Sequence, residues 1–141
     1  ERIYKGRLGE ACGRFVLEQN GIAVADIDDA FRFEKFDFVL PGTLGDQEVF
    51  IDFKHWKKHS DRTGWDSEKL IDWVFAKMEA IDAKKAIVAN VLPPDEGDYR
   101  ETHRSKDGRR LLVVPALVKG DCSFDETAIQ AIRRFTDGVA D

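Results

Sequence analysis

The sequence predicts a single α/β domain in which a mixed β-sheet is covered by helices on both faces. Residues 36–40 and 48–54 are rich in β-branched and aromatic residues, and the turn sequence PGTLGD between them indicates a hairpin. Apolar residues recur with a helical period over 65–82, and the apolar run at 86–92 is typical of a strand buried on both faces. A strand that follows a crossover helix pairs in parallel, so the hairpin and the crossover together predict a mixed sheet.

The composition fits one globular domain that spans residues 1–141. Apolar residues make up 43% of the chain and charged residues 35%, which excludes a disordered or low-complexity protein. No apolar run approaches the roughly 20 residues that a membrane-spanning helix needs. Because the chain begins with Glu1 rather than Met, we expect a fragment or a processed product. Cys12 and Cys122 are too few for a disulfide scaffold, and Cys12 is expected to be a buried free thiol.

The first element is a helix predicted over residues 6–20 and ended by Asn20-Gly21. Its expected buried face is an apolar stripe with helical spacing, made of Leu8, Ala11, Cys12, Phe15 and Val16. Each glycine costs a helix about 1 kcal/mol, yet three lie on another face of this one: Gly6, Gly9 and Gly13. Such a face indicates close approach of another backbone or of a ligand.

The segments after this helix are less regular. Residues 22–24 and 31–33 are candidates for short strands. In the helix over 65–82, Trp65 and Trp73 are expected to be packing residues. The chain closes with a helix over 125–135, for which Ser123 or Asp125 can serve as the cap.

Between the apolar run and the last helix, the sequence is mostly polar. Residues 93–110 are expected to hold no core element, although Asp107-Gly108 predicts an exposed turn. A strand is predicted over 111–118, and Pro115 within it favours a sheet edge or a bulge.

The net charge of −5 argues against a nucleic-acid partner, but the charges are unevenly distributed. Residues 54–62 hold four basic residues and one acid, and residues 100–110 hold five and two, so each segment carries +3. The rest of the chain therefore carries −11. Such segregation lets a chain attract a polyanion locally while its body stays acidic. Two solvated basic loops are the alternative interpretation.

The second hairpin strand ends with an acid and an amine, Asp52 and Lys54. Side chains alternate along a strand, so these two share one face. If PGTLGD is the whole loop, Asp37 lies opposite Phe50 and is a diagonal neighbour of Asp52 on that face. Two carboxylates so placed can hold one divalent cation, with a lysine beside them. A structural ion pair on the sheet is the alternative.

With Glu10 on the first helix, Asp37 on one strand, and Asp52 and Lys54 on the next, the chain resembles the PD-(D/E)XK nuclease superfamily. That superfamily has the restriction endonuclease-like fold. The resemblance covers residues 6–92 as an α-β-β-β-α-β order, to which this chain adds an extra strand and a C-terminal helix. As a motif it rests on four positions, and Phe36 stands where the family often has proline. The resemblance implies a metal-dependent endonuclease that hydrolyses phosphodiester bonds.

The resemblance also implies a role for each motif residue. Asp37 and Asp52 would hold one or two Mg²⁺ or Mn²⁺ ions, and Glu10 would complete the metal shell directly or through water. Lys54 would position the attacking water and stabilise charge on the phosphorane. Zinc is less expected, because no thiol or acid completes a zinc site with the nearby histidines. A solvated acid is the alternative for Glu10.

The basic segments supply candidates for contact with nucleic acid, since cations bind phosphates and an indole can stack on a base. These candidates are His55, Trp56, Lys57, Lys58, Arg100, Arg104 and Arg109.

A small nuclease without an added DNA-reading module resembles the C-terminal toxin domain of contact-dependent growth inhibition and other polymorphic toxin systems. That likeness implies action in the cytoplasm on DNA or tRNA, delivery by a secreted or cell-surface protein, and a cognate immunity protein as partner. Two alternatives stay open. One is a housekeeping DNase of the repair or restriction type. The other is a non-catalytic nucleic-acid-binding domain of the same fold, which a missing metal ligand would mark.

Overall fold

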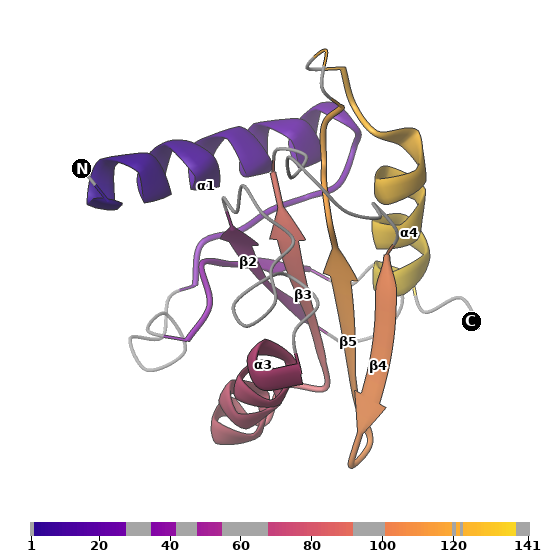
Figure 1. Cartoon of the computed structure of the whole chain (residues 1–141). Helices are drawn as coiled ribbons and strands as arrows, with labels where there is room; N and C mark the ends of the chain where they lie inside the picture. The colour runs from indigo at the N-terminus through magenta and orange to yellow at the C-terminus, as the bar shows by residue number, and fades with distance from the viewer. Residues whose placement is uncertain are drawn as a thin grey trace.

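The structure is a computed structural model of the chain. It describes residues 2–27, 35–41, 48–54, 68–91, 101–119, 121 and 123–137, and of residues 2–9 it describes the backbone alone. Helices and strands follow one another along these residues as Figure 1 shows. Their bounds are α1 Arg2–Gln19, β1 Phe38–Leu40, β2 Val49–Lys54, α3 Glu68–Ile81, β3 Lys85–Asn90, β4 Thr102–Lys106, β5 Arg109–Val114 and α4 Glu126–Thr136.

The strands form one five-stranded mixed sheet in the order β1-β2-β3-β5-β4 (Figure 1). Strands β2, β3 and β5 are parallel, while the edge strands β1 and β4 are antiparallel to their neighbours. Helix α3 lies in the connection from β2 to β3, as the sequence predicts for a crossover. The mixed α/β fold is therefore confirmed.

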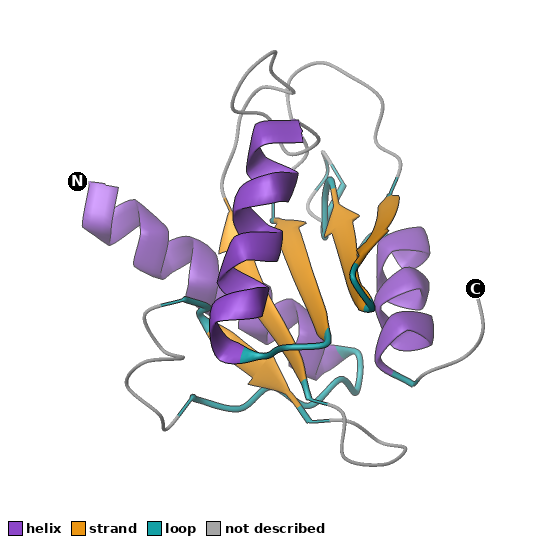
Figure 2. Cartoon of the chain, turned by 90° about the horizontal axis from the view of Figure 1, so that it is seen from below, coloured by secondary structure: helices purple, strands orange, loops and turns teal. Residues whose placement is uncertain are grey.

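Helices cover both faces of the sheet, α3 on one and α1 with α4 on the other (Figure 2). Alternate residues of each central strand point to opposite faces and build two separate cores. On β3, Ile87 belongs to the core under α1 and α4, and Val88 belongs to the core under α3. Helix α4 begins where the sequence predicts, because the Asp125 side chain accepts a hydrogen bond from the Ala128 N–H at 3.1 Å.

The polar stretch before β5 contains a strand that sequence reasoning missed. Strand β4 is mostly exposed and pairs with β5 through the Asp107-Gly108 turn, in which both residues have positive φ. The predicted turn is confirmed. Because β4 covers the outer side of β5, the latter is an internal strand, and it ends at Val114, just before Pro115. The predicted strand is therefore confirmed over 111–114, whereas its continuation to residue 118, at a sheet edge or with a bulge at Pro115, was wrong.

Residues 22–24, which follow α1, do not form the predicted strand. Instead, the following residue, Ala25, exchanges backbone hydrogen bonds of 2.8 and 3.0 Å with Val39 on the outer side of β1. The predicted strand over 31–33, most of the predicted hairpin loop, Trp65 and Cys122 lie outside the described residues.

Helix α1 packs on the sheet through Gly13 and only part of its predicted apolar stripe. Phe15 is 57% exposed, and Ala11 and Cys12 are exposed as well, so the expected burial of these three residues was wrong. Val16 of the stripe is buried as predicted, and the other buried residues among the described side chains of α1 are Gly13 and Leu17. A Cβ added at Gly13 would lie 2.4 Å from the Phe53 ring. The glycine face therefore has a close neighbour at Gly13, but this neighbour is the Phe53 side chain of β2 and not the backbone or ligand that was predicted.

A Gly13→Ala substitution is expected to destabilise the fold by about 1–3 kcal/mol, because the new methyl group overlaps a packed aromatic ring. The free energy of unfolding from urea denaturation measures this loss. Cys12→Ala, at the exposed neighbouring position, is the matched control and should change it by less than about 0.5 kcal/mol. Equal stability of the two variants would contradict the tight contact between α1 and β2.

Candidate functional site

The register of the β1–β2 hairpin differs from the predicted one but keeps the two acids close together. Phe38 pairs with Ile51 and Leu40 with Val49, and the Asp37 N–H, just before β1, donates to the Ile51 carbonyl at 3.1 Å. The prediction that Asp37 lies opposite Phe50 was wrong, because the register of the hairpin is shifted by two residues. The proximity of the acids rests on the hydrogen bonds that each makes to the other's strand.

Backbone hydrogen bonds lock the two carboxylates to each other's strands. The Asp37 N–H donates to Asp52 Oδ1 at 3.0 Å, and the Phe53 N–H donates to Asp37 Oδ2 at 2.9 Å. The Asp52 side chain is almost fully buried, and Asp37 is half-buried. Each acid therefore has one oxygen fixed by the neighbouring strand, which defines where the other oxygen points.

The pKa of Asp37 is raised from 3.8 to about 7. Burial is the main cause, and the negative charges of Asp52 and Glu10 add to it, whereas the Phe53 hydrogen bond and the Lys54 charge act in the opposite direction. All three other motif residues thus lie within electrostatic reach of Asp37. The raised pKa shows that the ionised form of Asp37 is costly at this buried position beside a second carboxylate.

The raised pKa predicts that Asp37 destabilises the fold at neutral pH in the absence of divalent cations. The group binds a proton more tightly in the folded chain, so its contribution to stability falls as the pH rises from about 4 to about 7. After allowance for solvent screening, the cost is on the order of 2 kcal/mol. Asp37→Asn keeps an oxygen for the Phe53 N–H and removes the charge. It should therefore be more stable than wild type at pH 8.

Urea denaturation in a chelator, at pH 4.5 and pH 8, measures both proteins under matched conditions. The expected gap between Asp37→Asn and wild type is open at pH 8 and nearly closed at pH 4.5. A gap of equal size at both pH values would show that the Asp37 proton does not cause it.

Lys54 and Asp52 both face α3, as the alternation along β2 predicts. The Lys54 ammonium lies 5.7 Å from the centre of the Trp73 ring, and Asp52 Oδ2 accepts a bond of 2.5 Å from Lys77. Both partners are α3 residues. Trp73 is 54% exposed, so the expectation that it is a packing residue was wrong. Its indole instead borders the site next to Lys54.

Glu10 lies on α1 and is half-buried beside the buried Gly13. Its charge acts on Asp37, so the glycine face of α1 carries this acid toward the hairpin and not into bulk solvent. Its side chain has further interactions within the structure. Of the four motif residues, a hydrogen bond joins Asp37 and Asp52, whereas Glu10 on α1 and Lys54 on β2 act on Asp37 through their charges.

The carboxylate oxygens of Asp37 and Asp52 are suitable ligands for a divalent cation. Asp37 Oδ1 forms no hydrogen bond with any residue that the structure describes, and hard carboxylate oxygens suit Mg²⁺ or Mn²⁺ better than Zn²⁺. Within the described parts of the chain, no three His, Cys, Asp or Glu side chains form a ready-made metal cluster. Asp37 and Asp52 thus fit a divalent ion as a pair, with Glu10 farther out.

Of the predicted nucleic-acid contacts, the structure describes two, and His55, Trp56, Lys57, Lys58 and Arg100 lie outside the described residues. Arg104 on β4 is bound to both oxygens of Glu68, at 2.7 and 3.1 Å. Arg109 donates to the Asp82 side chain and, at 2.8 Å, to the Ala83 carbonyl. Strand β4 is three strand positions from β2, roughly 14 Å across the sheet. Both arginines therefore bind acids or backbone of α3 and of the turn that follows it, and they lie away from the pair Asp37 and Asp52.

Sequence reasoning missed two polar residues at the site. Lys77 lies on the buried side of α3 and Asn90 ends β3 beside Lys54, and both are buried. Lys77 carried a detectable signal, because it falls on the same helical face as Leu70, Val74 and Ile81, where an amine is unexpected. For Asn90, the only sign in the sequence of a role at the site was its position at the end of an apolar strand.

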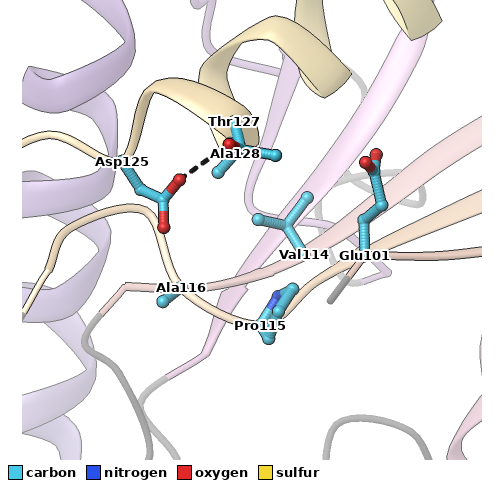
Figure 3. A pocket seen from close by; sticks show the side chains of 7 residues that line it. All are labelled: Glu101, Val114, Pro115, Ala116, Asp125, Thr127 and Ala128. Atoms are coloured by element: carbon cyan, nitrogen blue, oxygen red, sulfur yellow. Dashed lines mark hydrogen bonds between the residues drawn. The ribbon is translucent and has the colours of Figure 1, made fainter. Parts of the chain in front are cut away.

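A separate hollow of about 140 Å³ lies between the end of β5 and the start of α4 (Figure 3). Figure 3 shows the Asp125 carboxylate bonded to the first turn of α4, with Glu101 on the other side of the hollow. Asp125 is therefore used as a helix cap, and the hollow offers no pair of open charged groups. The hairpin acids are the better candidate.

Comparison with protein-family models and with curated proteins finds no match for this chain. Among the residues described, no helix is both long and apolar enough to cross a membrane.

Proposed function

We propose that this chain is a metal-dependent nuclease of the PD-(D/E)XK type, with the restriction endonuclease-like version of the α/β fold. The observation that carries the proposal is the grouping around Asp37. Asp52 accepts a hydrogen bond from the Asp37 N–H, and the charges of Glu10 and Lys54 both act on Asp37. A crowded carboxylate pair with an amine alongside is suited to phosphodiester hydrolysis, which needs a cation, a water and charge compensation.

Each residue has a definite task in this proposal. The Asp37 and Asp52 carboxylates would hold a Mg²⁺ or Mn²⁺ ion, and Glu10 would extend the shell. When bound, the ion supplies charge neutralisation for the phosphate and a lower pKa for a coordinated water. The Lys54 ammonium orients the attacking water and then donates to the oxygen that gains charge in the transition state. The peptide N–H groups of Asp37 and Phe53 keep both carboxylates in place.

The exposed Trp73 indole beside Lys54 supports nucleic acid as the substrate. A phosphate held near Lys54 places its sugar and base a few ångströms away, where an exposed aromatic ring offers a stacking surface. Stacking is tolerant of sequence and acts on DNA and RNA alike. The substrate is therefore DNA or tRNA, and digestion decides between them.

The test is digestion of plasmid DNA and of total tRNA, each with Mg²⁺ and with a chelator. We expect cleavage of one substrate with Mg²⁺ only, and loss of cleavage in Asp37→Asn. Binding without cleavage by the folded protein would overturn the enzyme assignment and favour the non-catalytic alternative. Cleavage that persists in Asp37→Asn would place the chemistry elsewhere.

We extend the proposal to a toxin role, in which a cognate immunity protein neutralises the nuclease. Expression in a bacterial cytoplasm should then arrest growth and degrade the substrate, and Asp37→Asn should do neither. A housekeeping repair or restriction-type DNase is the alternative, and normal growth with an active wild-type protein would favour it.

A further inference from the structure

Lys77 is a buried amine whose ammonium has two hydrogen-bond partners and lies close to two aromatic rings. Its Nζ donates to Asp52 Oδ2 at 2.5 Å and to the Lys35 carbonyl at 2.8 Å. The same ammonium lies 4.6 Å from the centres of both the Phe36 and Trp73 rings. Only 9% of the residue is exposed. Such a charge is costly to bury, so its partners must stabilise it where it stands.

The other buried lysine on the described part of the chain has an ordinary structural explanation. Lys85 Nζ donates to the Phe135 carbonyl at 2.8 Å, near the C-terminus of α4, where a helix favours a cation. Lys77 differs because its anionic partner is Asp52, one of the two acids proposed to hold a metal. Its ammonium therefore occupies the side of Asp52 that a second divalent ion would need.

The acceptor positions of the two acids lead to the same conclusion. Asp37 Oδ1 and the second lone pair of Asp52 Oδ1 stay open for one ion, because a carboxylate oxygen can accept two bonds.

We infer that Lys77 supplies a built-in positive charge in place of a second divalent ion, so that the site binds a single ion. Lys77 is a positioning residue in this role, because it acts on Asp52 and touches no reacting atom. The inference rests on the proposed function, since it concerns the same carboxylate pair. It also assigns Trp73 a second task, namely to shield the Lys77 ammonium from solvent.

The test counts bound Mn²⁺ by electron paramagnetic resonance of the free ion during a titration without substrate. The wild-type chain is expected to bind one ion, and Lys77→Arg, which keeps the cation, should also bind one. Lys77→Met opens Asp52 Oδ2 and should bind two. Lys69→Met, an exposed lysine of the same helix, is the matched control with one ion. Circular dichroism verifies that each variant is folded.

Two ions on wild type, or one ion on a folded Lys77→Met protein, would overturn the inference and leave the nuclease proposal intact. If Lys77→Met does not fold, the wild-type and Lys77→Arg counts decide the question. No bound ion on wild type at millimolar Mn²⁺ would instead contradict the proposed metal site itself, and the inference with it.

Discussion

A Lys54→Met protein is expected to cleave its nucleic acid about 10³-fold more slowly than wild type, with substrate binding changed only a few-fold. Methionine keeps the length and apolar stem of lysine but removes the ammonium. In the structure that ammonium forms no hydrogen bond with a described residue and lies over the Trp73 ring, at the open side of the site. It is therefore available to a water or a phosphate oxygen. Its loss should act on the chemical step.

Single-turnover cleavage with saturating Mg²⁺ measures the rate, and binding in Ca²⁺ measures affinity separately. Lys69→Met removes an exposed ammonium from the start of α3 and should cleave at the wild-type rate. A Lys54→Met protein that cleaves as fast as this control would refute the catalytic assignment of Lys54.

An Asp52→Ala protein is expected to lose about 3–5 kcal/mol of unfolding free energy, in addition to any activity. The reason is that the substitution leaves the buried Lys77 ammonium without its anionic partner. Lys77 is buried between two aromatic rings, and without Asp52 its ammonium keeps only the Lys35 carbonyl as a hydrogen-bond partner among the described residues. A loss of this size should lower Tm by roughly 10 °C in a domain of this length.

Urea denaturation of a small set of variants separates the cause from a general weakening of the sheet. The double variant Asp52→Ala/Lys77→Met removes both charges together and should regain most of the lost stability. Asp72→Ala, at an exposed position of α3, should change stability by less than about 0.5 kcal/mol. If the double variant is no more stable than Asp52→Ala, the ion pair is not what makes Asp52 structurally important.

The hairpin and its acids could be predicted from the sequence because strand alternation is a local rule. Asp52 and Lys54 share a face whatever the rest of the chain does. The register depended on where the loop ends, which composition does not determine. The error of two residues was harmless for Asp37 only because the side-chain period of a strand is two.

Contacts between residues far apart in the sequence could not be predicted from local patterns. In α1, the helical period of the apolar residues predicted that Phe15 is buried, but Phe15 is exposed. The helix instead packs through Gly13, because the absence of a Cβ atom there leaves room for the Phe53 ring. Lys77 belonged to the predicted core face of α3, yet its purpose depends on Asp52, which is 25 residues away. Strand β4 was missed because an exposed edge strand need not be apolar on either face.

Both edges of the sheet, its β1 and β4 margins, have features that oppose pairing with a strand from another chain. At the β1 margin, Ala25 already takes the outward backbone bonds of Val39. At the β4 margin, the outermost strand is short and carries the exposed Lys106, and an exposed lysine on an edge strand opposes pairing with a second copy. Each margin therefore has a feature that opposes the addition of a further strand, namely occupied hydrogen bonds at β1 and a charge at β4.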